Sequence, residues 1–159
     1  MQLVCHSDAS YLSVSNTRSR AGDHYFLSLP PDYKNNGAIH TMSQIIRNVM
    51  ASATEAEIAA LYMNARDSVA IQNILENFGH KQQPTLMQTD SKTAEGILNK
   101  KMQPKQKKAM DMRFHWLCDR QQQKHIKIFW KPGILNLGDN HTKHHPASHH
   151  QKMRTKYIT

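Results

Sequence analysis

Four carboxylates in this sequence stand where metal-assisted chemistry could take place. Asp8 follows the alternating stretch "QLVCHSD", which predicts a strand that ends in this carboxylate, and Asp90 directly follows a second predicted strand at residues 85–89. Glu57 lies near the start of a predicted helix, and Asp139 stands at the head of the last one. Because buried carboxylates are unfavourable without a partner, several of them on one sheet predict a bound divalent cation. Oxygen ligands favour Mg²⁺, and in a basic protein a nucleic-acid phosphate is the obvious further ligand.

The segment "ASATEAEIAA" contains two glutamates, and at most one of them can face a buried site. At about 100° per residue, Glu55 and Glu57 point to nearly opposite sides of a helix. Both also have a structural interpretation, since Ser52 to Glu55 and Thr54 to Glu57 each match a capping box. The apolar stripe of residues 52–78 points roughly along Glu57. This favours Glu57 as the inward-facing residue and Glu55 as the capping, solvent-facing one.

The chain is strongly basic, which favours a polyanionic partner. Its 159 residues include 21 Lys and Arg against 12 Asp and Glu, a formal charge of +9, and such a balance suits nucleic acid. The length suits one domain with its own core. No apolar run approaches the roughly 20 residues of a membrane-spanning helix. Cys5 and Cys118 are too few for a disulfide framework, although one bridge between them is allowed. We expect a soluble, intracellular protein without a membrane partner.

The elements that would position the carboxylates follow one another in an informative order. Strands are predicted near residues 2–8, 24–29, 38–46, 85–89 and 125–131, and helices over residues 52–78, after residue 90, over about 109–122 and from 136 onward. Three consecutive strands followed by alternating helices and strands favour a mixed sheet with helices on its faces. Sites in such sheets form where strand ends open away from the helices. Asp139 has a structural alternative here, because a carboxylate at a helix N-terminus complements the helix dipole.

With these residues in place, the chain resembles the ribonuclease H domain that ends the reverse transcriptase of copia-type (Ty1/copia) long-terminal-repeat retrotransposons. Five blocks follow the family's order from about residue 3 to residue 145: "HSDAS", "SATEAEIAAL", "QTDSKTAEGIL", "MDMRFHWL" and "LGDNHTKHH". The resemblance implies an α/β (α+β mixed), ribonuclease H-like fold, with a five-stranded mixed sheet, three leading antiparallel strands and helices on both faces. It also implies a domain over residues 1–145, followed by a basic, His-rich tail over residues 146–159.

The resemblance further implies an activity and its catalytic residues. Carried over position by position, the catalytic and metal-binding residues are Asp8, Glu57, Asp90 and Asp139. They would hold two Mg²⁺ ions, for which Mn²⁺ can substitute, with Asp8 as the bridging ligand. The implied reaction is hydrolysis of the RNA strand of RNA/DNA hybrids during reverse transcription. The implied partners are the hybrid and the polymerase domain of the same polyprotein, and the isolated domain is expected to be a monomer that acts in a cytoplasmic virus-like particle.

Further polar residues are expected to contact the nucleic acid. Selection of RNA over DNA would rest on 2′-hydroxyl contacts, for which the candidates are Ser10, Ser52 and Ser91, although each also suits an ordinary cap or turn. The Lys-rich run at residues 99–108 suits either a solvated loop or a clamp on the phosphate backbone. The basic candidates are Lys100, Lys101, Lys107, Lys108 and Arg113.

Two features of the last third depart from better-studied ribonucleases H. The segment "KPGILNLG" lacks the histidine that many of them carry before the fourth carboxylate, so turnover is slow or His141, His144 or His145 substitutes. The cluster "HTKHHPASHH" is expected to be a solvated basic tail rather than a zinc site, because it has no nearby cysteine and Pro146 interrupts the helix. Two alternative functions stay open: a catalytically silent module that only holds nucleic acid, and another nuclease of the same fold, of integrase or resolvase type.

Overall fold

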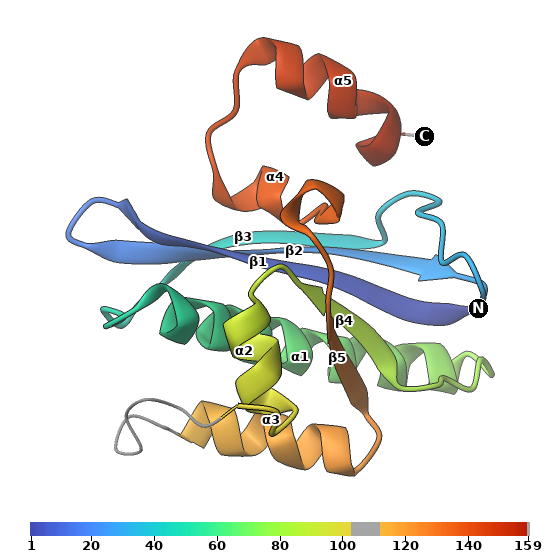
Figure 1. The fold of residues 1–159 in the computed structure, drawn as a ribbon. Helices are drawn as coiled ribbons and strands as arrows, with labels where there is room; N and C mark the ends of the chain where they lie inside the picture. The colour runs from blue at the N-terminus through green and yellow to red at the C-terminus, as the bar shows by residue number, and fades with distance from the viewer. Residues whose placement is uncertain (103–111, 159) are drawn as a thin grey trace.

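Five strands form one sheet in the order β3-β2-β1-β4-β5 in the computed structural model, which describes residues 1–102 and 112–158 (Figure 1). The strands are β1 (Gln2–Val14), β2 (Arg18–Ser28), β3 (His40–Ile46), β4 (Thr85–Thr89) and β5 (Ile126–Trp130). β1 pairs antiparallel with β2, as β2 does with β3, whereas the β1–β4 and β4–β5 pairs are parallel. The prediction of a mixed sheet that begins with three antiparallel strands is confirmed.

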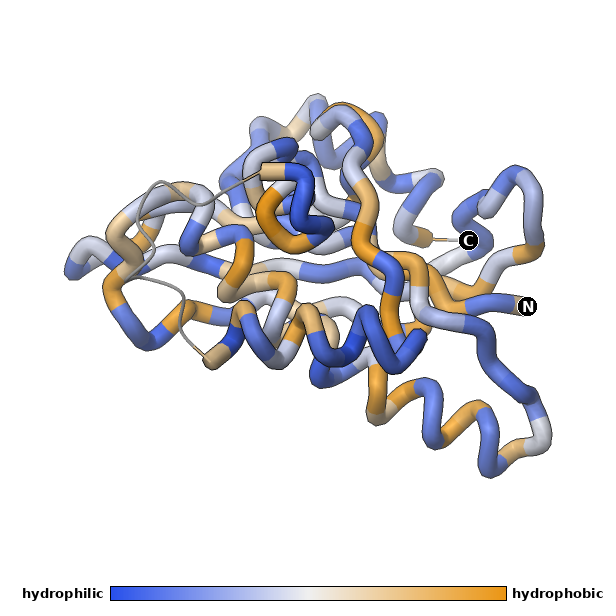
Figure 2. Tube along the Cα trace, turned by 60° about the horizontal axis from the view of Figure 1, so that its bottom comes forward, coloured by the Kyte–Doolittle hydropathy of each residue, from blue (hydrophilic) through white to orange (hydrophobic). Residues whose placement is uncertain are grey.

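Helices cover both faces of this sheet, as predicted. They are α1 (Ala53–Asn77), α2 (Lys92–Leu98), α3 (Met112–Gln122), α4 (Asp139–Thr142) and α5 (Ala147–Tyr157), with a 3-10 turn at Gly133–Leu135. Helices α1, α2 and α3 lie on one face, and α4 and α5 lie on the other (Figure 1). Hydrophobic and hydrophilic residues alternate along the helical turns (Figure 2), which is typical of helices with one buried side. Within the described ranges, no helix is long and apolar enough to cross a bilayer.

Up to Ser10, β1 is buried on both faces because it lies at the centre of the sheet. Leu3 and Cys5 belong to the core cluster that includes Leu61 of α1, whereas Val4 belongs to a cluster on the opposite face, as the two-residue period of a strand requires. Cys5 and Cys118 are both free. A carboxylate in the middle of this strand is therefore surrounded by protein rather than by water.

The first strand is longer than the sequence indicated. β1 continues through Asp8 to Val14 and pairs with β2 up to Ser10 opposite Arg20, with an irregularity in register between Ser10 and Val14. The prediction that this strand ends at Asp8 is wrong. Residues 9–14 lack a clear apolar alternation, and the pairing partner at the start of β2 supplies the hydrogen bonds that extend the strand.

The C-terminal segment is more ordered than a solvated tail. Residues 147–157 form α5, in which Met153 and Tyr157 pack against the cluster that contains Val4 and Phe26. The Tyr157 hydroxyl also donates a hydrogen bond to the carbonyl of Leu137 (2.7 Å). The expectation of a solvated basic tail is therefore wrong for this face of α5, because one apolar and one aromatic side chain, Met153 and Tyr157, dock it on the sheet. The domain boundary at residue 145 stays a prediction.

Candidate active site

Asp8 is a buried carboxylate on the central strand. It is 1% exposed, and its Oδ2 accepts a hydrogen bond from the Thr142 hydroxyl. Its Oδ1 has no hydrogen-bond partner among the described residues. Burial raises the pKa of Asp8 to about 6, against the opposing effects of the Thr142 hydrogen bond and the charge of Lys143. A carboxylate so placed favours a nearby cation.

The start of α1 separates its two glutamates as the sequence predicted. Ser52 caps the helix by accepting a hydrogen bond from the amide of Glu55 (3.1 Å), and the Glu55 carboxylate reaches back to a backbone amide before the helix (2.7 Å). This is a variant of the capping box, in which Glu55 binds the amide of Ala51, one residue before the cap. Glu57 is instead 8% exposed, and it accepts hydrogen bonds from the Ala9 amide (3.3 Å) and the Thr89 hydroxyl (3.4 Å). The inward orientation of Glu57 and the capping role of Glu55 are confirmed.

Asp90 directly follows β4, at the carboxyl end of the strand that runs parallel to β1. The Trp130 indole donates a hydrogen bond to the Asp90 carbonyl (2.9 Å) and holds the turn into α2. Gly133 leaves space for the side chain, since a Cβ added there would lie 2.8 Å from Asp90 Oδ2. Burial raises the pKa of Asp90, and Lys143 counteracts that rise. The sequence correctly placed this carboxylate at a strand end.

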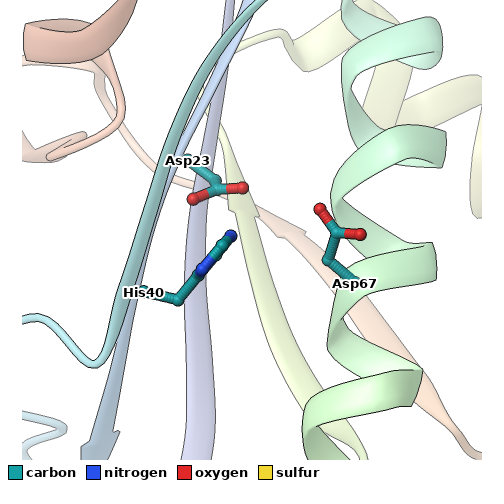
Figure 3. Close-up of side chains that lie close together, drawn as sticks. All are labelled: Asp23, His40 and Asp67. Carbon is teal, nitrogen blue, oxygen red and sulfur yellow. The ribbon is translucent and has the colours of Figure 1, made fainter.

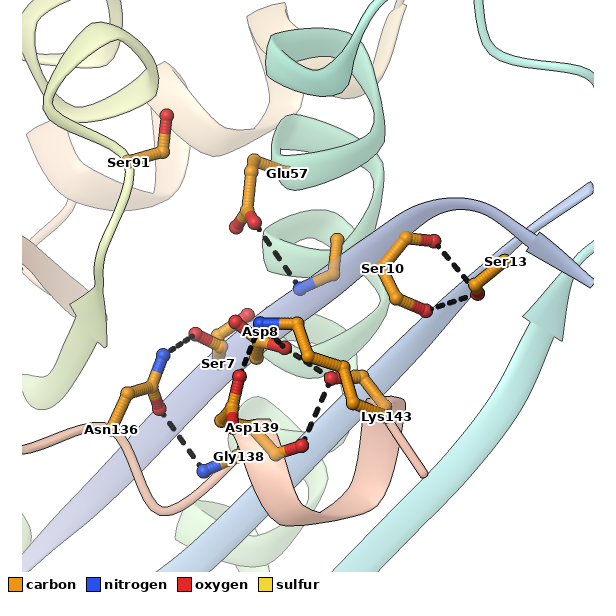
Figure 4. A network of polar contacts seen from close by, with 12 residues as sticks. Ser7, Asp8, Ser10, Ser13, Glu57, Ser91, Asn136, Gly138, Asp139 and Lys143 are labelled. Carbon is orange, nitrogen blue, oxygen red and sulfur yellow. Dashed lines mark hydrogen bonds and ion pairs between the residues drawn. The ribbon is translucent and has the colours of Figure 1, made fainter. Parts of the chain in front are cut away.

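The carboxylates of Asp8, Glu57 and Asp90 meet at one point. Each offers an oxygen, and these atoms lie within 4.8 Å of one another. Figure 4 shows Glu57 on α1 facing the strand that carries Asp8. Burial, followed by the charges of Asp8 and Asp90, raises the pKa of Glu57 well above its usual value. Without a cation, three such groups repel one another and favour their protonated forms.

The fourth carboxylate, Asp139, begins α4, which docks closely on the sheet. The Asn136 side chain donates to a carbonyl of β1 (2.8 Å) and accepts from the Gly138 amide (3.0 Å), which pins the loop before α4 (Figure 4). A Cβ on Gly138 would lie 2.7 Å from a backbone oxygen of β1, and a Cβ on Gly22 would lie 2.7 Å from the Thr142 methyl group. The two glycines therefore allow α4 to approach β1 and β2 closely enough to present Asp139.

Lys143 connects Asp139 to the other carboxylates. Its place in the site was not predicted from the sequence. Its ammonium donates a hydrogen bond to Asp139 Oδ1 and lies 3.9 Å from Asp8 Oδ2. Burial lowers the pKa of Lys143, but its bond to Asp139 and the charges of Asp8 and Asp90 outweigh burial and raise it. The available signal was the four-residue spacing in "DNHTK", which one helical turn brings together. Asp139 thus lies outside the compact group of three and is linked to it by a lysine.

His145 lies beside the fourth carboxylate. Its Nε2 is 3.3 Å from Asp139 Oδ2. His141 faces elsewhere, with its ring stacked 6.1 Å from that of His24 and in edge contact with Tyr157, while His144 is exposed. Of the three histidines considered as substitutes for the missing loop histidine, the structure places His145 next to Asp139.

Replacing Lys143 by Met is expected to strengthen Mg²⁺ binding and to weaken the metal-free fold. The ammonium competes with a metal for Asp139 and Asp8, so its removal should raise Mg²⁺ affinity several-fold. Its ion pairs are partly exposed, so the loss of stability in chelator should be modest, about 0.5 to 1 kcal/mol. Calorimetric Mg²⁺ titration and melting curves measure both effects. Lys152→Met on α5 is the matched control, and equal Mg²⁺ affinity in the two variants would show that Lys143 does not compete.

The donor set suits a hard divalent cation. The four candidate ligands are all carboxylates, which Mg²⁺ prefers, and one oxygen of Asp8 lacks a partner in the described part of the chain. Lys143 already supplies positive charge at the same place. The residues present therefore fit a divalent metal, and the number and identity of the ions stay predictions.

The three serines predicted to contact RNA all have contacts within the protein. Ser52 caps α1, and Ser91 caps α2 by accepting a hydrogen bond from the amide of Ala94 (3.1 Å). The Ser10 hydroxyl is hydrogen-bonded to that of Ser13. Both the cap interpretation and the nucleic-acid interpretation therefore stay available for these residues, and the latter stays a prediction.

The predicted basic contacts are only partly within the described residues. Lys100 is exposed, and Lys101 lies 2.5 Å from a carboxylate oxygen of Glu95 while its side chain is 64% exposed. Arg113 is half-buried on α3. Lys107 and Lys108 lie outside the described residues. Binding of nucleic acid by this basic run stays a prediction.

Comparison with known proteins finds a sequence relative among retroelement polyproteins. No protein-family model matches the chain. It is 26% identical over 107 residues to the retrovirus-related Pol polyprotein from transposon TNT 1-94 of Nicotiana tabacum, a match that covers 67% of this chain and 8% of the polyprotein. The chain therefore spans only a small part of that relative.

Solved structures with the same architecture include ribonucleases H and a retroviral enzyme. LC11-RNase H1, isolated from compost, has a TM-score of 0.66 at 12% identity, over 89% of this chain and 92% of that one. The N-terminal ribonuclease H domain of a Mycobacterium tuberculosis protein has a TM-score of 0.62 at 15% identity, over 89% and 90%. The foamy viral protease-reverse transcriptase has a TM-score of 0.57 at 19% identity, over 88% and 90%. This chain thus has the ribonuclease H fold and resembles, in sequence, the Pol polyprotein of a copia-type retrotransposon.

Proposed function

We propose that this chain is a retroelement ribonuclease H domain that hydrolyses the RNA strand of RNA/DNA hybrids. The observation that carries the proposal is the convergence of Asp8 on β1, Glu57 on α1 and Asp90 after β4, with oxygens within 4.8 Å of one another, in a ribonuclease H fold. The Lys143 ammonium forms ion pairs with both Asp139 and Asp8, so it links Asp139 to this group. The formal charge of +9 suits binding of the hybrid backbone.

Each residue of the site has a role in this proposal. When bound, a pair of Mg²⁺ ions supplies an activated water and stabilises the leaving 3′ oxygen. Asp8, Glu57, Asp90 and Asp139 would hold the metal: Asp8 as the common ligand, Glu57 and Asp90 toward the leaving group, and Asp139 toward the attacking water. His145, beside Asp139, is placed to move a proton. The products are a 3′-hydroxyl and a 5′-phosphate.

The relatives support the substrate and the context. LC11-RNase H1 has been solved in complex with an RNA/DNA hybrid, in a structure that matches this chain with a TM-score of 0.66 at 12% identity. The tobacco relative is a Pol polyprotein of which this chain spans about 8%. We accordingly propose the polymerase domain of the same polyprotein as a partner, a monomeric state for the isolated domain, and action in a cytoplasmic virus-like particle.

A panel of labelled substrates tests the proposal. RNA/DNA hybrid, duplex DNA, duplex RNA and single strands are incubated side by side with Mg²⁺, Mn²⁺ or chelator. We expect cleavage of the RNA strand of the hybrid with either metal and none in chelator. Equal cleavage of both strands of duplex DNA would favour a nuclease of integrase or resolvase type, and binding of the hybrid without cleavage would favour a silent module. Either outcome contradicts the proposal.

Neutralising the basic run is expected to weaken hybrid binding and to flatten its dependence on salt. For each phosphate that the protein no longer neutralises, the slope of log affinity against log salt should fall by about one unit. The variant replaces Lys100, Lys101, Lys107 and Lys108 by Gln, and binding is measured over a salt series. A charge-matched control replaces four exposed lysines elsewhere, Lys34, Lys81, Lys127 and Lys152. If both variants have the parent's slope, the run does not contact the hybrid.

A further inference from the structure

A second group of potential metal ligands lies between the sheet and α1, outside the proposed active site. Asp23 on β2, His40 at the start of β3 and Asp67 on α1 each offer one ligand atom, and these atoms lie within 4.8 Å of one another (Figure 3). The group shares no residue with the cluster around Asp8. Three separate elements of the fold therefore bring metal-binding side chains to one place.

Asp23 is the innermost member of this group, and it lacks partners. It is 0% exposed, and neither of its carboxylate oxygens has a hydrogen-bond partner within normal geometry among the described residues. Burial, followed by the charge of Asp67, raises the pKa of Asp23 to about 7, against a smaller opposing effect of the Met42 backbone. Buried polar groups in native proteins are nearly always paired. A buried carboxylate with two unpaired oxygens that faces an imidazole and a second carboxylate favours binding of a cation.

The donors of this group indicate which cation would bind. Two carboxylates balance the charge of a divalent ion, and a neutral imidazole adds a ligand without adding charge. Mg²⁺ favours oxygen ligands, whereas an imidazole nitrogen favours Zn²⁺. Zn²⁺ with three protein ligands keeps a further position for water. We propose that Asp23, His40 and Asp67 bind one Zn²⁺ ion between β2, β3 and α1.

The geometry of the fold separates this site from the proposed active site. In the β1–β2 register, Asp23 lies opposite Ser7, which accepts a hydrogen bond from the Asn64 side chain of α1 (2.7 Å). The next residue, Asp8, is hydrogen-bonded to Thr142 of α4. Because successive side chains of a strand point to opposite faces, Asp23 faces α1 whereas Asp8 faces α4.

The position of the site also indicates what a bound ion would do. β3 is an edge strand of the sheet, and His40 at its start is exposed, so the ion can enter from solvent. A Zn²⁺ ion held by all three residues would tie this edge strand and α1 to β2. Its expected effect is therefore on the stability of the fold, independently of cleavage.

Zinc binding is tested on protein without a histidine affinity tag and in an Asp8→Asn background, which weakens metal binding at the active site. Calorimetric titration with Zn²⁺ alone is expected to show one ion per chain, and adding His40→Gln or Asp23→Asn should weaken it at least tenfold. Zn²⁺ should also raise the melting temperature of the Asp8→Asn protein but not that of the double variants. His40 is exposed, so His40→Gln leaves the fold intact and keeps the test valid even if Asp23→Asn is unstable.

Two controls separate this site from other histidines. His115→Gln removes an exposed histidine on α3, and the pair His149→Gln and His150→Gln removes two histidines of α5; both should keep the affinity for Zn²⁺ at the proposed site. Loss of Zn²⁺ binding in the α5 variant, or equal affinity with and without His40, overturns the proposal. A Mg²⁺ titration of the same protein should show no binding that depends on His40.

Discussion

Glu57→Gln is expected to reduce cleavage of the RNA strand by roughly 10³-fold, because loss of a charged ligand removes several kcal/mol of transition-state stabilisation from a metal site. The Glu57 carboxylate meets those of Asp8 and Asp90 with ligand atoms within 4.8 Å of one another. Glutamine keeps its size; its amide oxygen can accept the hydrogen bond from Ala9, and its NH₂ group can donate to the Thr89 hydroxyl oxygen, so the fold should persist. Single-turnover rates on labelled hybrid at saturating Mg²⁺ measure the effect.

Glu55→Gln is the matched control, two residues away on the same helix. Glu55 belongs to the capping box of α1, and glutamine preserves that box. Its cleavage rate should stay within about twofold of the parent rate, since the side chain faces away from the site. Similar rates for Glu55→Gln and Glu57→Gln would contradict the assignment of Glu57.

Asp8→Asn is expected to abolish cleavage and, in chelator, to stabilise the protein. Asparagine keeps the shape and can still accept the hydrogen bond from Thr142, but it removes one charge from a cluster in which Glu57 and Asp90 also repel. At neutral pH the gain in unfolding free energy should be on the order of 1 kcal/mol. A catalytic residue whose loss stabilises the fold indicates that the carboxylates are held together against repulsion.

The gain in unfolding free energy from Asp8→Asn should increase with pH. The pKa of Asp8 is raised to about 6 in the folded protein, above its value of about 3.9 in an unfolded chain. The folded parent therefore binds more protons between these values, and Asp8 makes the parent less stable as pH rises through this window. The stability difference should be near zero around pH 4 and complete above pH 6. Histidines whose pKa is lowered by burial, such as His6 and His24, have the opposite dependence but are present in both proteins. A difference that shrinks as pH rises would contradict this account.

The sequence could predict those features of the site that depend only on neighbouring residues within one helix or strand. The helical register separated Glu57 from Glu55, because the apolar stripe and the capping pattern are both properties of one helix. Asp90 follows a short strand whose bounds, Thr85–Thr89, are as predicted. Asp139 stands at the head of a helix in the structure as well. In each case the neighbouring residues alone define the geometry.

Features that depend on pairing between distant segments could not be predicted. The extension of β1 past Asp8 depends on the early start of β2, which no periodicity marks. The docking of α4 depends on Gly22 and Gly138, whose missing side chains matter only once β2 and the last loop are in contact. The approach of His40 to Asp23 likewise depends on the β2–β3 register and on α1. Such contacts arise from tertiary packing, which single-sequence patterns do not encode.

Melting curves with Mg²⁺ and with chelator, for the parent and for Asp8→Asn, test the central claim that the four carboxylates form one metal site. A ligand that binds only the folded state raises its stability by an amount that grows with its affinity. We predict that Mg²⁺ raises the melting temperature of the parent clearly more than that of Asp8→Asn, which lacks the shared ligand. If Mg²⁺ shifts both melting temperatures equally, Asp8, Glu57, Asp90 and Asp139 do not bind metal together, and the account is contradicted.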